Sequence, residues 1–356
     1  MIDFPASPTP GQRFTAAGAT WIFDGVKWLP EGLAPTVAPG INDNRIINGD
    51  MRIDQRNNGA SGTAIAYTVD RWRYTANQPT KGTWGQANCT VPGFAKSLGF
   101  TSSSAYASAA GDAFQLEQPI EADMITDFAW GTVNAQPVTL SFWAWSSLTG
   151  TFSGSLKAVG TTRCYPFSYQ IPVASTWTRV VVAVPGDAAG AWVLSGNTGA
   201  LTVLFDLGAG STFRGPAGAW AVGPYNGVTG SVSIVGTNGA SFYVTGVKLE
   251  IGSVATPFNR QSLAKSLADC QRYYQQLTSC MMAVNGNGAG IIGSSIPYPV
   301  VMRAAPTVGL GSPQYFNASA LATNAIYADI IRFQCTVTAS GYAYAVANPL
   351  TLSAEL

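Results

Sequence analysis

The sequence of 356 residues contains no histidine. Histidine is the commonest general base near neutral pH, the middle member of the usual Ser/His/Asp triads and the commonest zinc ligand. Its absence removes many classes of enzyme mechanism. Carboxylate chemistry stays open, because a glycosidase needs only two acidic groups placed across a sugar bond.

Acidic residues gather in one segment, FQLEQPIEADMITDF, which contains Glu117, Glu121, Asp123 and Asp127. Such a group could supply a pair of catalytic carboxylates. Acids in a solvated loop are the more ordinary explanation of a cluster of this kind. We therefore assign no catalytic residue and expect that the protein is not an enzyme.

Charge is scarce as well: 10% of the residues are charged, and 19 basic against 18 acidic residues give a formal charge of +1. This balance provides no basic surface for nucleic acid or acidic lipid. No apolar run approaches the roughly 20 residues of a membrane span, and the N-terminus lacks the pattern of a signal peptide. We expect no nucleic-acid partner, no membrane insertion and synthesis in the cytoplasm.

Cysteine is infrequent, with five residues that are odd in number, widely spaced and without a CxxC pair. Neither a disulfide framework nor a zinc site is indicated by this pattern. We expect them to be small buried side chains. They are Cys89, Cys164, Cys270, Cys280 and Cys335.

Glycine (39), proline (21) and many threonine, serine and aromatic residues are typical of short strands joined by tight turns. The sequence therefore predicts a mainly β fold. In VTLSFWAW, strict alternation places Val138, Leu140, Phe142 and Ala144 on one face and Trp143 with Trp145 on the other. Composition and turn signals divide the chain into an arm (1–40), a jelly-roll β-sandwich (41–258), one short helix (259–283) and a small C-terminal β domain (284–356).

The arm contains WIFDGVKW between proline-rich flanks. Asp24-Gly25 predicts a two-residue hairpin turn, which places Trp21, Phe23, Val26 and Trp28 on one face. That face is too apolar to remain exposed to water, and an isolated hairpin is marginally stable. Packing within the protein's own trimer and docking on a separate partner both explain it.

The segment SLAKSLADCQRYYQQL has helical periodicity. Its apolar residues are spaced by four, three, four and three, which is the seam of a coiled coil. This seam favours self-association as an axial bundle, and packing of the helix on the side of the sandwich is the alternative. The predicted trimer contacts are Leu263, Leu267, Cys270, Tyr274 and Leu277.

Several segments together resemble the tail fibre and receptor-binding proteins of tailed bacteriophages. They are INDNRIINGDMRIDQRNNGAS, YTVDRW, FQLEQPIEA, VTLSFWAWSS, VTGVKLEIGSVATPFNRQSLAKSLADCQRYYQQL and YPVVMRAAPTV, and GQRFTAAGATWIFDGVKW resembles a virion attachment segment. The resemblance implies a homotrimeric virion protein whose N-terminus faces the virion and whose C-terminal β tip, rich in aromatic residues, points outward. It favours a fibre that binds a host cell-surface polysaccharide, and a purely structural capsid or baseplate component with protein partners is the alternative.

Two further sets of residues could bind ligands. Asp50, Asp54 and Glu250 resemble the positions where carbohydrate-binding jelly rolls hold a structural calcium, although no cofactor is assigned. Flat aromatic faces could stack on sugar rings, but tryptophans in a large β protein are mostly core, so no glycan-binding residue is assigned. The aromatic candidates are Trp143, Trp145, Trp192, Trp220 and Tyr225.

Overall fold

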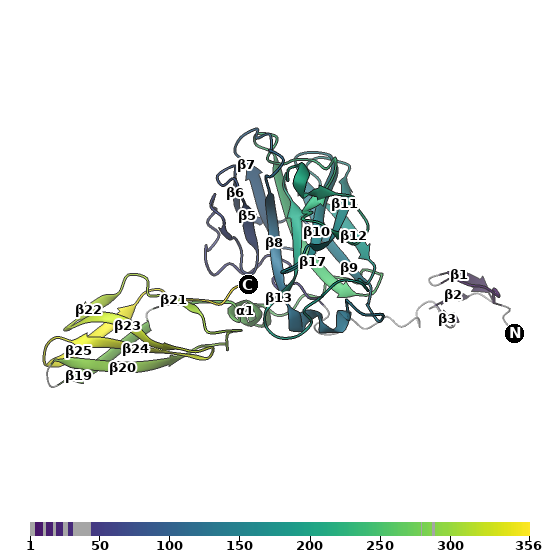
Figure 1. Cartoon of the computed structure of the whole chain (residues 1–356). Coiled ribbons are helices and arrows are strands. Elements are labelled where there is room, and N and C mark those ends of the chain that lie inside the picture. Colours follow the sequence, from purple (N-terminus) through teal and green to yellow (C-terminus); the bar gives the residue numbers. More distant parts are fainter. Residues whose placement is uncertain are drawn as a thin grey trace. The chain divides into compact units, whose positions relative to one another are not determined.

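The computed structural model describes residues 4–9, 12–16, 19–23, 28–30, 44–278, 280–286 and 289–356. Contacts between residues divide the chain into two units, 1–43 and 44–356. Strands dominate both units, which confirms the prediction of a mainly β chain (Figure 1). No helix in the described part of the chain is long and apolar enough to cross a membrane.

The first unit contains one antiparallel sheet of three strands, β1 (Arg13–Ala16), β2 (Ala19–Phe23) and β3 (Trp28–Pro30). The pairing of Phe23 with Trp28 leaves four residues between β2 and β3, so the predicted two-residue turn is wrong. Phe4 covers the sheet, with its ring centroid 5.2 Å from those of both Trp21 and Trp28. Phe23 also contacts Trp28, while Val26 lies outside the described residues.

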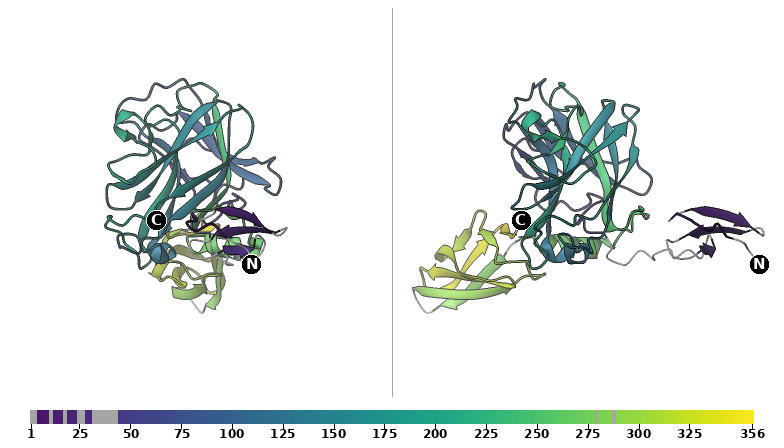
Figure 2. Two further views of the ribbon diagram at one scale, coloured as in Figure 1. Left: turned by 90° about the vertical axis from the view of Figure 1, so that its right-hand side faces the viewer. Right: turned by 45° about the vertical axis from the view of Figure 1, so that its right-hand side comes forward.

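The second unit begins with a β-sandwich of two antiparallel sheets. The chain crosses repeatedly between the two sheets, as in jelly rolls (Figures 1 and 2). The larger sheet contains, in spatial order, β15 (Ala221–Val222), β11 (Arg163–Ile171), β10 (Gly150–Ala158), β13 (Gly199–Asp206), β8 (Phe114–Glu121), β5 (Arg73–Ala76) and β4 (Ala66–Tyr67). The smaller contains β12 (Thr178–Val184), β9 (Val138–Ser146), β17 (Ser241–Ile251), β7 (Lys96–Ser102) and β6 (Gly82–Asn88). Two 3₁₀ helices (Ala122–Phe128 and Ser211–Phe213) and a parallel pair, β14 (Arg214–Gly215) and β16 (Gly227–Val228), lie in the connections.

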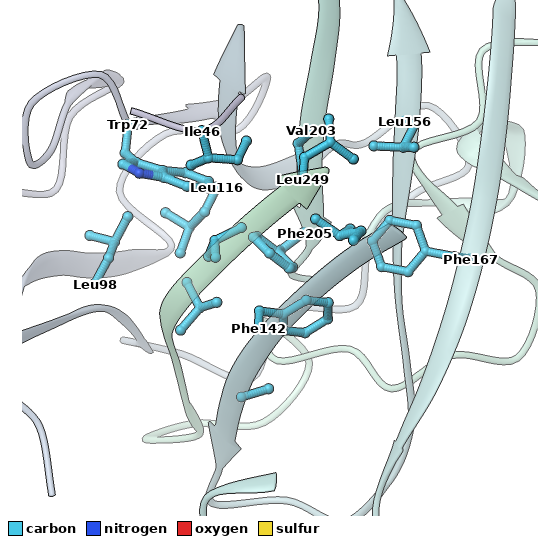
Figure 3. Packing of buried hydrophobic residues seen from close by; sticks show 14 of the residues in the cluster. Ile46, Trp72, Leu98, Leu116, Phe142, Leu156, Phe167, Val203, Phe205 and Leu249 are labelled. Carbon is cyan, nitrogen blue, oxygen red and sulfur yellow. The ribbon is translucent and has the colours of Figure 1, made fainter. Parts of the chain in front are cut away.

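The core of the sandwich lies between the two sheets (Figure 3). Phe142 of β9 points into it and packs against Phe205 of β13, with ring centroids 4.9 Å apart. The alternation predicted for β9 is confirmed, because its inward residues are fully buried whereas Trp143 and Trp145 are only half-buried. Trp72 is fully buried in the same core.

The helix predicted within 259–283 is present, but it is shorter than expected. Helix α1 spans only Leu263–Gln271, and Tyr274 with Leu277 lie in strand β18 (Tyr274–Leu277). The heptad pattern is overridden because β18 pairs antiparallel with β26 (Leu350–Ser353), so the backbone of these residues is satisfied by a sheet.

The buried face of α1 also differs from the predicted seam. Ser266 and Cys270 are buried within the chain, and Arg52 donates to the hydroxyl of Ser266 at 3.0 Å. Cys270 is fully buried by its own chain and cannot face a second copy. Leu263 is 58% exposed and Leu267 is half-buried, so these two residues stay available for the predicted trimer contact.

The C-terminal domain consists of three small antiparallel sheets around a second core. Their strands, each in spatial order, are β18, β26 and β21 (Thr307–Gly309); β19 (Cys280–Gly286), β25 (Gly341–Ala347) and β22 (Gln314–Phe316); and β20 (Gly290–Pro297), β24 (Ile330–Val337) and β23 (Ala318–Ile326). All five cysteines are free; Cys164, Cys270 and Cys335 are buried and the other two are half-buried.

A buried charge cluster joins the sandwich to the last residues of the chain, whose end is marked C in Figures 1 and 2. Arg71, with a side chain only 1% exposed, forms an ion pair with Glu355 and lies 3.5 Å from the centre of the Tyr273 ring. Arg56 contacts the other carboxylate oxygen of Glu355 at 3.0 Å. Glu355 therefore bridges two arginines at this junction.

Candidate functional site

The outer face of the five-stranded sheet carries partly exposed aromatic rings. Trp143 and Trp145 point to this face because they alternate with the core residues of β9. Tyr243 of β17 pairs directly with Trp145, and their rings meet edge to face with centroids 5.2 Å apart. All three side chains are half-buried, so each keeps part of its surface accessible.

Glycines on the two neighbouring strands leave space beside Tyr243. The pairing places Gly85, Gly99, Tyr243 and Trp145 in one row across four strands. A Cβ atom at Gly99 would lie 2.2 Å from the Tyr243 ring, so this ring rests directly on the backbone of β7. Gly99 is therefore needed to hold Tyr243 in this orientation.

A groove of about 400 Å³ runs along these glycines. Its lining includes Tyr243, Ser61, Thr83 and Thr101. Gln86 also lines it, but its side-chain amide donates to the backbone carbonyl of Met51 at 2.7 Å. The Thr101 and Ser241 hydroxyls are 2.8 Å apart, which fixes one side of the groove. Hydroxyl and aromatic groups can hydrogen-bond and stack with a polyol, and none of the lining residues carries a carboxylate or a cationic group.

The aromatic row continues past Trp143. Gly246, in a left-handed conformation at a bulge of β17, lies under the rings of Phe94 and Trp143: a Cβ there would be 2.7 Å and 3.3 Å from them. Phe94 contacts Phe258 edge to face at 5.2 Å. We call this set the aromatic strip; it consists of Phe258, Phe94, Trp143, Trp145 and Tyr243.

The other predicted stacking residues lie elsewhere. Trp192 and Trp220 pack against the buried Trp130, with centroids 4.7 Å and 5.0 Å away. Their indole N–H groups donate to Asp187 and to the backbone carbonyl of Pro185, so both serve the structure. Tyr225 lies against the glycines of another turn, Gly215 and Gly223.

Tyr243 was not among the residues predicted from the sequence. The signal was present, because SFYVTGVKLE alternates like VTLSFWAW and places Tyr243 and Thr245 on its polar face. Only the pairing of β17 with β9 and β7 brings this tyrosine beside Trp145 and Gly99. Contacts of this kind depend on strand order, which local patterns do not fix.

The acidic residues singled out as calcium candidates bind different partners. Asp50 contacts Arg52 at 2.5 Å and Arg260 at 3.2 Å. Asp54 accepts hydrogen bonds from the backbone of Asn57 and Gly59, and Glu250 pairs with Lys248 at 2.9 Å. Within the described ranges, no group of three or more His, Cys, Asp or Glu residues is arranged to hold a metal ion.

The acidic segment is only partly the solvated loop expected from the sequence. Glu117 and Glu121 lie on β8, are buried and pair with Arg73 at 2.6 Å and Arg272 at 2.8 Å. Asp123 and Asp127 are exposed in the 3₁₀ helix that follows. The expectation of solvated acids was therefore wrong for the first two, which fold into strand β8 and are neutralised by arginines.

A second group of exposed aromatic residues lies on the C-terminal domain. Phe316 of β22 pairs with Tyr344 of β25, and their rings stack with centroids 5.7 Å apart. Phe316 is 50% and Tyr342 49% exposed. The aromatic residues of the predicted tip thus lie on strands β22 and β25.

Comparison with solved structures finds proteins with a similar fold. No protein-family model and no curated protein matches the chain. Among solved structures, the enzymatically active domain of tailspike protein 4 from bacteriophage CBA120 is 15% identical with a TM-score of 0.32, and the match covers 59% of this chain but only 22% of that one. A family 11 carbohydrate-binding module from Clostridium thermocellum, solved with a β-1,3-1,4-mixed-linked tetrasaccharide, is 10% identical with a TM-score of 0.29, and the match covers 55% of this chain and 99% of the module. At such TM-scores these likenesses carry no functional argument.

Proposed function

We propose that this chain is a non-enzymatic virion protein of a tailed bacteriophage, a homotrimeric fibre or spike that binds a polysaccharide on the host cell surface. The aromatic strip and its groove carry the binding part of the proposal. A pyranose ring has an apolar face of C–H groups and a rim of hydroxyls, so it fits an aromatic ring flanked by hydroxyl side chains. The virion assignment rests on the sequence resemblance of the segments around Asp50 and Trp72 and of the segment 244–277.

The aromatic rings of the site are already held in a fixed orientation, which favours ligand binding. Tyr243 is fixed on Gly99, and Trp145 is fixed on Tyr243. A ligand that stacks on these rings would lose little free energy in ordering the protein, because the rings are already held in place. The neutral lining of the groove suits neutral sugar hydroxyls better than it suits acid–base catalysis.

A glycan array tests the proposal with the full chain, Trp145→Ala and a control, Tyr327→Ala. Tyr327 is 48% exposed and lies in the C-terminal domain, so its loss matches the loss of an exposed aromatic ring elsewhere. We expect wild type and control to bind the same glycans and Trp145→Ala to lose at least about fivefold in affinity, since a stacking contact contributes roughly 1–3 kcal/mol by analogy with base stacking. A wild type that binds no glycan would favour a purely structural virion component.

A separate role for the C-terminal domain follows from the patch around Phe316, Tyr342 and Tyr344, which could contact the host or cap the trimer. Replacing Phe316 and Tyr342 together by Ser would distinguish the two roles. Loss of cell binding with an unchanged trimer mass would support recognition, and loss of the trimer would support a cap.

A further inference from the structure

The outer face of the seven-stranded sheet differs from the aromatic strip because it is charged. A cleft of about 530 Å³ lies on this face, lined by residues of β5, β8, β10 and β13 and by the last residues of the chain. Its charged lining residues are Arg73, Glu117, Lys157, Arg303 and Glu355. Hydroxyl and amide groups of Gln115, Thr198 and Thr202 complete the polar lining.

Both carboxylates of the cleft are already paired. Glu117 binds Arg73 at 2.6 Å. Glu355 binds Arg71 and Arg56, which come from outside the lining. The carboxylates are therefore committed to other cations and do not neutralise Lys157 or Arg303.

Lys157 has only neutral protein partners among the described residues. Its ammonium donates to Oδ1 of Asn226 at 2.6 Å and to the carbonyl of Pro224 at 3.3 Å. An ammonium has three N–H donors, so one is left for a group in the cleft. Burial lowers the pKa of Lys157, and the nearby charge of Glu117 offsets this only in part.

Arg303, which also lines the cleft, likewise has neutral hydrogen-bond partners. Its guanidinium donates to backbone carbonyls only, those of Asn197 at 2.7 Å, Glu355 at 2.9 Å and Ala354. The cleft thus has two cations whose partners are neutral, in a chain whose formal charge is only +1. An anionic ligand would supply the missing charge.

We propose that this cleft binds an acidic saccharide, with the carboxylate of a hexuronate unit on Lys157 and the sugar hydroxyls on the Thr202 and Gln115 side of the cleft. The volume is in the range of small-ligand sites and far exceeds what a bare ion fills. The inference extends the proposed glycan binding to a second face of the sandwich, and it names the charge class of the sugar.

Calorimetric titration of the full chain tests this site with three probes: a hexuronate disaccharide, its carboxyl-reduced neutral form and inorganic phosphate. We expect the acidic disaccharide to bind about tenfold more tightly than the neutral form, as one charge-assisted hydrogen bond implies. Lys157→Met should reduce this ratio to about one, and Lys157→Arg should keep most of it. Lys96→Met is the matched control, because Lys96 lies on the other sheet and bonds Asn88, and it should leave the ratio unchanged.

Equal affinity of wild type for the acidic and neutral disaccharides would overturn the inference, as would a ratio that survives in folded Lys157→Met. Phosphate that binds as tightly as the acidic disaccharide, with the same dependence on Lys157, would show a simple anion site instead. Failure of this inference can be distinguished from failure of the proposed function, because Trp145→Ala should leave the titration with the acidic disaccharide unchanged. If wild type binds no glycan on the array but binds the acidic disaccharide more tightly than the neutral form, only the proposal for the aromatic strip is refuted.

Discussion

Replacing Glu355 by Gln should destabilise the second unit strongly. The substitution keeps the shape of the side chain but removes the only carboxylate bound to Arg71, whose side chain is 1% exposed. Arg56, 14% exposed, loses the same partner, so two guanidinium groups would face each other across an uncharged amide. Breaking a buried ion pair from one side costs about 3–5 kcal/mol, which is a large part of the 5–15 kcal/mol that stabilises a typical domain.

Denaturant unfolding monitored by tryptophan fluorescence measures this loss in free energy. Asp269→Asn is the matched control, because Asp269 pairs with Lys265 on the exposed surface of α1 and such pairs contribute about 0.3–0.5 kcal/mol. The triple variant Arg56→Met, Arg71→Met and Glu355→Leu should recover most of the loss, since all three charges of the cluster are removed. A loss below about 1 kcal/mol for Glu355→Gln, or a triple variant as unstable as the single one, would refute the reasoning.

Three further predictions concern pH, assembly and attachment. Burial raises the pKa of Asp70 from 3.8 to about 6, so the folded state binds this proton more tightly, and wild type loses stability as pH rises from about 4 to 6. The free energy of unfolding of Asp70→Asn relative to wild type should therefore increase by about 3 kcal/mol between pH 4 and pH 8. A difference that stays constant with pH would contradict this. Light scattering should give a trimer for the parent and a monomer or aggregate for Leu267→Asp, and a monomeric parent would rule out the trimer. Deleting residues 1–38 should leave the trimer folded but abolish incorporation into virions; incorporation of the truncated chain would exclude the arm as the anchor.

The sequence predicted the β class and the core of the sandwich because these depend on local alternation. The inward and outward faces of β9 followed directly from VTLSFWAW. The end of α1 could not be predicted in this way: the heptad spacing continues to Leu277, yet β18 pairs with residues more than seventy positions away in β26. Long-range pairing thus overrode the helix that the local pattern predicted for Tyr274–Leu277.

The contacts that form the sites could not be predicted from local sequence patterns either. Arg71 and Glu355 form one buried pair although 284 positions separate them, and nothing near either residue indicates the other. Lys157 and Arg303 line one cleft for the same reason. The aromatic strip was half predictable, because Trp143 and Trp145 lie on one strand, whereas Tyr243 and Gly99 join them only through the order of the sheet.

The binding of a cell-surface polysaccharide to the aromatic strip is tested most directly by titrating the glycan selected on the array into wild type and Trp145→Ala. Circular dichroism and light scattering would first establish that the variant keeps its fold and mass. The account predicts a loss of affinity of at least about fivefold from this one ring. Unchanged affinity in the folded variant would contradict it.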